Sequence, residues 1–229
     1  MAFDSSTSFG PPNPAAKFDS FSRLSLQHRT YRNIGKRMFD LLVVSVSAFP
    51  ALIILSILAL IISLDGRSPF YSQNRVGRNG RVFRMFKLRS MVAGADDVLE
   101  SYLANNPDAK AEWDRTQKLK NDPRITGFGK IIRATSMDEL PQIINVLLGE
   151  MSIVGPRPMM CDQRALYPGS EYYAMRPGIT GFWQISVRNE SSFSQRAQFD
   201  RAYFMQLSFL TDLKVILRTF GVVLRATGH

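Results

Sequence analysis

An uncharged run of 24 residues dominates the sequence between Leu41 and Leu64, and it reads LLVVSVSAFPALIILSILALIISL. As an α-helix this run would be about 36 Å long, which is enough to cross a hydrocarbon core roughly 30 Å thick. Length and apolar composition alone therefore favour a straight transmembrane helix.

Two further features favour a bent helix. Pro50 lacks a backbone donor and its ring clashes with the preceding turn, so we expect a bend there, with the Ser47 hydroxyl close to the break. Basic residues flank the run on both sides: Arg29, Arg32, Lys36 and Arg37 precede it, and Arg67, Arg75, Arg78, Arg81, Arg84, Lys87 and Arg89 follow it. Because Lys and Arg gather on the cytoplasmic side of membrane segments, we predict a re-entrant helix over residues 31–66, with a spanning helix as the alternative.

The charge balance indicates an anionic partner. The chain has 29 Lys and Arg against 19 Asp and Glu, a formal net charge of +10. Nucleic acid, an anionic membrane surface or a phosphorylated substrate would each fit. A nucleic acid leaves the apolar run unexplained, so we expect no nucleic-acid partner.

Histidine and cysteine are too scarce to carry the chemistry. His28 lies in a polar N-terminal stretch and His229 is the last residue, so acid–base or nucleophilic steps must use other groups. The lone cysteine, Cys161, excludes an intrachain disulfide and a multi-thiolate zinc site. We expect Cys161 to be a buried, inert thiol.

The rest of the chain predicts a mostly helical α/β fold. Residues 1–30 lack periodicity and are expected to be a disordered tail rather than a signal peptide. Two strand-like runs, Phe70–Val76 and Arg81–Leu88, flank the sequence GRNG, whose Gly and Asn suit a hairpin turn. Met91 to about Trp113 is expected to be helical, with an interruption near Pro107.

The segment from Arg201 to about Arg225 is predicted to be one helix. Its apolar residues recur every three or four positions: Tyr203, Leu207, Leu210, Leu213, Leu217, Phe220 and Leu224. This stripe fits a core-facing helix and equally an amphipathic helix on an anionic membrane. The nearby apolar run favours the membrane.

The sequence TSMDELPQ places two carboxylates, Asp138 and Glu139, side by side. It is a good helix start, in which Ser136 caps the helix and Glu139 completes a capping box. Taken alone, this structural account is the stronger. The functional alternative is that a helix N-terminus holds a phosphate beside an ionised Asp138, which attacks phosphorus with a divalent cation bound.

Basic and aromatic motifs follow the same pattern of two interpretations. GPRP presents Arg157 on a rigid turn, either solvated or clamping a phosphate. FKLRS places Lys87 and Arg89 on one strand face, either protecting a strand edge or making a second phosphate contact. For Trp183 in RPGITGFWQIS, core packing is favoured over contact with a base or sugar. Asp200 either starts the last helix or contacts a ligand.

The order of these motifs resembles the bacterial sugar transferase family, the monotopic phosphoglycosyl transferases, over about Tyr31 to Ala226. The resemblance rests on KRMFD before an apolar run broken by proline, then FKLRSM, NDPRIT, SMDELPQIINVLLGEMSIVGPRP, RPGITGFWQIS and FDRAYF. The chain is most similar to members that begin exopolysaccharide synthesis by transferring galactose 1-phosphate or glucose 1-phosphate to undecaprenyl phosphate. One departure is that Phe49 precedes Pro50, where the family often has Ser.

The resemblance implies a small catalytic domain over residues 67–229, held by amphipathic helices on the cytoplasmic face of the bacterial inner membrane. Asp138 would attack the β-phosphate of a UDP-sugar, UMP would leave, and undecaprenyl phosphate would take the phosphosugar from the aspartyl intermediate. Glu139 would assist the acceptor step or the metal, and Mg²⁺ would sit with Asp138 and the pyrophosphate. Arg157 would bind phosphate. Three further residues would surround the same site: Lys87, Arg89 and Asp200.

Some alternatives stay open. A non-catalytic membrane scaffold would need only the basic patches and amphipathic helices. The sugar is open between galactose and glucose, and the oligomeric state is open, with a homodimer on the membrane as one alternative.

Overall fold

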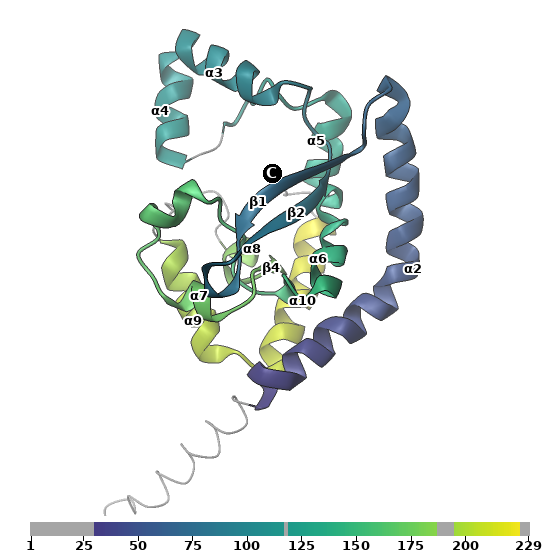
Figure 1. Cartoon of the computed structure of the whole chain (residues 1–229), viewed down its shortest axis with the longest axis vertical. Coiled ribbons are helices and arrows are strands. Elements are labelled where there is room, and N and C mark those ends of the chain that lie inside the picture. Colours follow the sequence, from purple (N-terminus) through teal and green to yellow (C-terminus); the bar gives the residue numbers. More distant parts are fainter. Residues whose placement is uncertain (1–29, 117–118, 187–194, 225–229) are drawn as a thin grey trace, which may run out of the picture.

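A computed structural model describes residues 30–116, 119–186 and 195–224. In it a long helix lies along a body of short helices and small sheets (Figure 1). The predicted mostly helical α/β fold with a β-hairpin is confirmed. The predicted tail, apart from Thr30, lies outside the described residues.

The apolar run forms the long helix α2, Lys36–Ile62, between a π-helical turn at Tyr31–Gly35 and a 3₁₀ turn at Ser63–Asp65. Figure 1 shows α2 bent partway along, its oblique purple part continuing into an upright blue part. Pro50 lies inside the helix, which stays continuous through the bend. By length and composition this stretch could cross a membrane. Only 11% of its most apolar 18 residues is buried, whereas the core helix of a soluble protein is mostly buried.

The predicted hairpin is formed by β1, Phe70–Val76, and β2, Val82–Leu88, which pair antiparallel. Asn79 and Gly80 in the turn have φ angles of 58° and 74°. Asn and Gly tolerate this left-handed backbone better than other residues do, so the turn residues set the hairpin.

Helices cover the hairpin and extend beyond it. The predicted helix near residues 91–113 is two helices, α3 (Ala95–Asn105) and α4 (Pro107–Thr116), which meet at the expected proline. They stand at the top of Figure 1. Next come α5, Gly127–Ala134, and α6, Gln142–Leu148.

The second sheet pairs two short parallel strands, β3 (Ser152–Val154) and β4 (Gly178–Thr180). Between them lie a 3₁₀ turn at Asp162–Leu166 and α7, Glu171–Ala174. A short helix α8, Phe182–Ile185, follows β4 and contacts both C-terminal helices.

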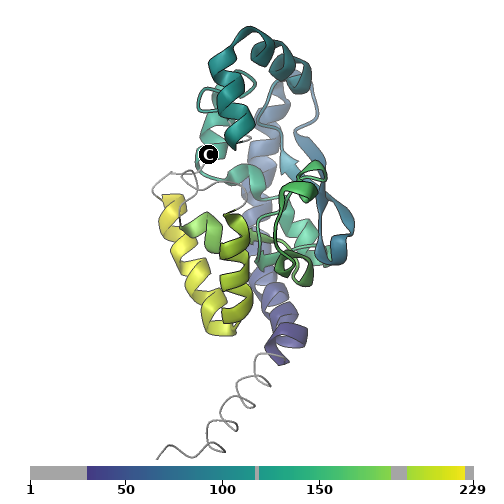
Figure 2. The same cartoon turned by 90° about the vertical axis from the view of Figure 1, so that its left-hand side faces the viewer.

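The prediction of one C-terminal helix is wrong, because the chain forms α9 (Arg196–Gln206) and α10 (Phe209–Leu224). Leu207 between them has extended ψ and is buried in the core, and the Ser208 hydroxyl accepts a hydrogen bond from the Thr211 amide. The chain therefore turns at Leu207, and Figure 2 shows α9 and α10 as two separate helices. The predicted end at Arg225 lies outside the described residues.

The apolar stripe predicted for this segment divides between core and surface. Tyr203 and Leu207 are buried, whereas Leu210 and Phe220 on α10 are each 63% exposed. An exposed apolar face favours the amphipathic alternative for α10. Cys161 is exposed, so the expectation of a buried thiol is wrong: this residue lies in the surface loop that follows the GPRP turn.

Candidate active site

The carboxylate pair lies on a 3₁₀ turn, Met137–Glu139, between α5 and α6 rather than at a helix start. The predicted capping box is therefore wrong. Ser136 has a φ of 56° and makes no side-chain cap, because this left-handed residue turns the chain out of α5. The next helix begins at Gln142, after Pro141.

Lys87 on β2 holds both carboxylates. Its Nζ lies 3.2 Å from Oδ2 of Asp138 and 2.9 Å from Oε1 of Glu139. All three side chains are largely buried, with Asp138 9% exposed. Two adjacent negative charges can be kept together in a partly desolvated place because a cation lies between them.

Asn145 fixes α6, and with it the carboxylate turn, to β2. Its Oδ1 accepts from the Phe86 amide at 3.0 Å, and its Nδ2 donates to the Arg84 carbonyl at 2.8 Å. Nδ2 also donates to Glu150 at 2.7 Å. The carboxamide is fully buried and pairs with the strand edge as another strand would, so Lys87 and Asp138 have a fixed register.

The GPRP turn follows β3, and the RPGITGFW segment runs beside it through β4. Gly155 N donates to Thr180 O at 2.8 Å, and Gly178 N donates to Pro156 O at 2.8 Å. A Cβ on Gly155 would collide with the Arg176 carbonyl, and one on Gly178 would collide with the Gly155 amide. The two motifs therefore need glycine to approach this closely.

This close approach brings Arg157 to Trp183. The guanidinium carbon of Arg157 lies 5.5 Å from the Trp183 ring centroid, and that of Arg196 on α9 lies 5.4 Å from the same ring. Nη2 of Arg196 also donates to the Arg157 carbonyl at 2.6 Å. Trp183 is buried, as the preferred core-packing interpretation expected, and it supports two cations as well.

Arg75 on β1 joins these two arginines, and we call Arg75, Arg157 and Arg196 the arginine cluster. Burial lowers the pKa of Arg75 to about 10, and Arg157 adds to the effect. Burial likewise lowers the pKa of Arg196 to about 10, although the negative charge of Asp200 raises this pKa. Buried Nε of Arg75 has no hydrogen-bond partner among the described residues. Clustered, partly desolvated cations of this kind favour binding of an anion.

Asp200 lies inside α9 and does not start it. It is buried and accepts a hydrogen bond from the Tyr167 hydroxyl at 2.7 Å. Burial raises the pKa of Asp200 to about 6, and Tyr167 and Arg196 oppose this rise. Asp200 thus belongs to the surroundings of the arginine cluster, one helical turn after Arg196.

The hairpin connects the carboxylate pair to the arginine cluster. Tyr71 stands opposite Lys87 in the register, and Arg75 lies four residues further along β1. Residues opposite each other, and residues two apart on a strand, share one face of a sheet. Lys87 and Arg75 therefore lie on one face, about 13 Å apart along the strand.

Arg89 lies elsewhere. Its guanidinium makes two hydrogen bonds to Asp65, of 2.7 and 2.6 Å, at the end of the long helix. The structure thus groups Lys87 with Asp138 and Glu139. It places Arg157 near Asp200 through Arg196, and it places Arg89 at the end of α2. Sequence reasoning did not select Arg75 or Arg196 for the site, although Arg196 precedes Asp200 by four residues and so shares its helix face.

The carboxylate pair suits a hard cation only in part. Among residues 30–116, 119–186 and 195–224, no three His, Cys, Asp or Glu side chains form a metal-binding group. Mg²⁺ is commonly held by one or two carboxylates with water and substrate phosphates, so Asp138 and Glu139 fit such a site once substrate oxygens complete it.

An exposed apolar helix beside a carboxylate pair and clustered guanidinium groups is the combination expected of a membrane enzyme with an anionic substrate. The Bacterial sugar transferase family profile matches residues 31–226. The chain belongs to this family, and the resemblance seen in its motifs is confirmed.

Curated relatives agree with this assignment. Exopolysaccharide production protein ExoY of Rhizobium meliloti (strain 1021) is 44% identical over 204 residues, covering 87% of this chain and 90% of that protein. The UDP-galactose-lipid carrier transferase of Erwinia amylovora is 48% identical over 198 residues, covering 84% of this chain and 41% of that protein. The undecaprenyl-phosphate galactose phosphotransferase of Salmonella typhimurium is 44% identical, with the same two coverages. The chain thus spans about two fifths of two relatives and most of the third.

Proposed function

We propose that this chain is an undecaprenyl-phosphate sugar phosphotransferase. It transfers a sugar 1-phosphate from a UDP-sugar to undecaprenyl phosphate and releases UMP, as the first membrane step of exopolysaccharide synthesis. The observation that carries the proposal is the carboxylate pair of buried Asp138 and partly buried Glu139, held by Lys87 on the hairpin face that also bears Arg75. The names of two relatives support galactose as the sugar, and glucose is the alternative that the resemblance implies.

In the first half-reaction, an Asp138 oxygen attacks the β-phosphorus of the UDP-sugar. An oxygen–phosphorus bond forms, the bond from that phosphorus to the bridging oxygen breaks, and UMP leaves with the bridging oxygen. Lys87 holds the attacking carboxylate and lies beside the charge that develops on the phosphoryl oxygens. The arginine cluster binds the diphosphate through charge-assisted hydrogen bonds.

In the second half-reaction, a phosphate oxygen of undecaprenyl phosphate attacks the same phosphorus. The bond to Asp138 breaks, the carboxylate is restored, and the sugar diphosphate lipid leaves. Glu139 has no part in the covalent bond and shares Lys87 with Asp138, so its place is beside the acceptor phosphate or the cation. Mg²⁺, held by Asp138 and pyrophosphate oxygens, would neutralise phosphate charge.

The membrane arrangement follows from the exposed apolar surfaces. Residues 31–66 form a re-entrant helix that enters and leaves the inner membrane from the cytoplasmic face, and residues 67–229 form the catalytic part. This arrangement is supported by the bend of α2, a helix that contains Pro50, and by the exposed apolar side chains of α2 and α10. The undecaprenyl chain can then lie in the bilayer while its phosphate reaches the carboxylate pair.

The test is UMP release by the detergent-purified protein across a panel of UDP-sugars, with undecaprenyl phosphate and Mg²⁺. We expect release with UDP-galactose or UDP-glucose, and loss of release in Asp138→Ala. The matched control is Asp108→Ala, an exposed carboxylate in the first turn of α4, which should keep wild-type activity. Wild-type release by Asp138→Ala would overturn the proposal.

A further inference from the structure

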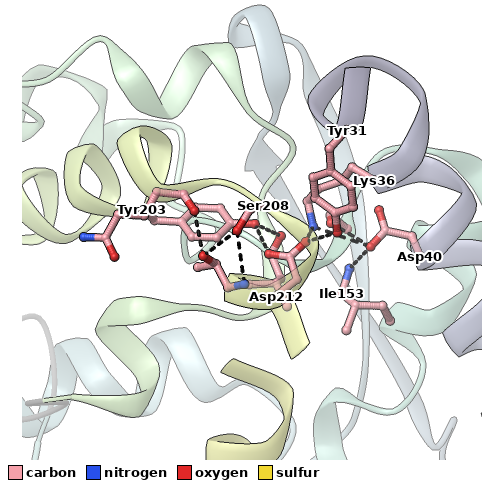
Figure 3. Close-up of polar contacts among 11 residues, drawn as sticks. Tyr31, Lys36, Asp40, Ile153, Tyr203, Ser208 and Asp212 are labelled. Carbon is pink, nitrogen blue, oxygen red and sulfur yellow. Dashed lines mark hydrogen bonds and ion pairs between the residues drawn. The ribbon is translucent and has the colours of Figure 1, made fainter. Parts of the chain in front are cut away.

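The start of the long helix is bonded to the catalytic body through a buried carboxylate. Asp212 on α10 is fully buried, and Figure 3 shows it among side chains of three other elements. Its Oδ2 accepts from the Tyr31 hydroxyl at 2.6 Å and from Nζ of Lys36 at 2.8 Å. Its Oδ1 accepts from the Tyr203 hydroxyl at 2.6 Å. Three donors satisfy one buried charge, which makes this attachment rigid.

Asp40 on α2 extends the attachment to β3. Its Oδ1 accepts from the Ser152 hydroxyl at 2.9 Å. The same oxygen accepts from the Ile153 amide at 3.0 Å, as Figure 3 shows. The strand that these bonds hold leads directly into the Gly155–Pro158 turn that presents Arg157. The entry end of α2 therefore fixes the segment that carries the phosphate-binding arginine.

The exit end of the same helix is bonded to the other half of the site. Arg89 makes its two hydrogen bonds to Asp65, and Nη2 also donates to the Ile62 carbonyl at 3.0 Å. Arg89 lies two residues after Lys87, and its amide donates to Pro69 at 2.8 Å, which continues the hairpin pairing. The exit end of α2 therefore fixes the strand that holds the carboxylate pair.

The bend lies between these two attachments. Asp65 lies 25 positions after Asp40, which would span about 38 Å in a straight helix. Each half of α2 contributes to a buried cluster that includes a β2 residue: Val44 lies in one cluster with Phe83, and Leu58 lies in another with Leu88. α2 is therefore attached to the body on both sides of its bend, through apolar and polar contacts alike.

We propose that α2 is a brace between the two halves of the site, in which Asp40 and Arg89 are positioning residues. The entry attachment fixes Arg157, the exit attachment fixes Lys87, and the bent helix sets how the arginine cluster faces Asp138. This inference rests on the proposed phosphotransferase function. It also assigns Arg89 to the membrane helix and not to the substrate.

The exit attachment gives the sharper test, because its charges can be exchanged. We expect Arg89→Ala to lower kcat for UMP release by about 10- to 100-fold while KM for the UDP-sugar changes less than threefold, since small misplacements of reacting groups reduce the rate of the chemical step. Asp65→Ala should behave alike, and the double variant D65R/R89D should recover at least fivefold over R89A. The exposed pair Lys110–Asp114, whose charged atoms lie 2.8 Å apart, is the control, and K110A and D114A should keep wild-type kinetics.

Other outcomes overturn the inference. A raised KM with unchanged kcat in R89A would make Arg89 a substrate ligand, and unchanged kinetics would remove any role. Should R89A fail to fold, Arg89→Lys replaces it, because Lys keeps the charge and loses the bidentate contact. A lowered kcat with nearly unchanged KM would support the inference, and a raised KM with unchanged kcat would overturn it. The proposed function is tested separately, because UMP release by Asp138→Ala decides it and the Arg89 variants do not.

Discussion

Nζ of Lys87 lies 3.2 Å from Oδ2 of Asp138, although the two residues are 51 positions apart in the sequence. Lys87 comes from the hairpin and Asp138 from the turn between α5 and α6, and Asn145 holds the two elements together. A cation is therefore fixed beside the proposed nucleophile before any substrate arrives. Such preorganisation costs no rearrangement during the reaction.

Replacing Lys87 should affect the chemical step. We expect Lys87→Met to lower kcat for UMP release by about 10²–10³-fold, the usual effect of removing one preorganised donor from a site of developing charge. Steady-state kinetics with the UDP-sugar measures this. A Lys87→Met enzyme with kcat within threefold of the wild type would show that Lys87 only balances charge in the resting protein.

Arg75 in the arginine cluster should favour binding of the UDP-sugar without stabilising the folded protein. Arg75→Met removes a buried cation, so the free energy of unfolding should not fall, whereas KM for the UDP-sugar should rise about tenfold or more, because a charge-assisted contact to phosphate is lost. Denaturation curves and kinetics on one preparation test both effects. The control is Arg78→Met in the exposed hairpin turn. An unchanged KM in Arg75→Met would exclude Arg75 from diphosphate binding.

Asp200 predicts a pH dependence of stability with a defined sign. Because its pKa is raised from 3.8 to about 6 in the folded protein, the neutral carboxyl is favoured there, and its contribution is greatest below about pH 4. As pH rises from 4 to 6, the folded protein must ionise a buried group and loses about 3 kcal/mol relative to Asp200→Asn. Arg196, with a pKa of about 10, keeps its charge over this range.

The measurement compares unfolding of wild type and Asp200→Asn at pH 4, 5, 6 and 7. The amide keeps an acceptor for Tyr167, so the difference between the two proteins isolates the titration. We expect this difference to move in favour of the variant as pH rises. A difference that is constant with pH would contradict a raised pKa.

The two glycine-containing motifs should tolerate no side chain at their contact. Gly155→Ala would bring its Cβ within 2.8 Å of the Gly178 amide and into the Arg176 carbonyl. We expect it to lower the free energy of unfolding by about 1–3 kcal/mol, as other overpacked sites do. The matched control is Gly127→Ala, where no atom lies within 4 Å and helix propensity improves. Equal stability of the two variants would contradict the close approach.

The sequence predicted the elements whose signals are local. The bend of α2 follows from one proline, and the hairpin follows from strand-like runs around Asn79 and Gly80. The motif order sufficed to select Asp138, Glu139 and Arg157 as candidates. These signals need no knowledge of how distant segments pack.

What failed depended on tertiary contacts. Ser136 and Glu139 are the residue types that a capping box needs, but Ser136 has a left-handed backbone and makes no cap. Glu139 accepts a hydrogen bond from Lys87 instead. The single C-terminal helix had the right periodicity, but burial of Leu207 turned the chain. Arg75 could not be selected because no local pattern indicates that it meets Arg157, and the only local signal for Arg196 was its spacing of four residues from Asp200.

The most direct test of the central claim is mass spectrometry of the protein after incubation with UDP-galactose or UDP-glucose and Mg²⁺, without undecaprenyl phosphate. The account predicts that the protein gains one hexose phosphate, that the modified peptide contains Asp138, and that adding undecaprenyl phosphate removes the modification. The Asp138→Asn protein should gain nothing. UMP release without any adduct on Asp138, or an adduct on another residue, would contradict the account.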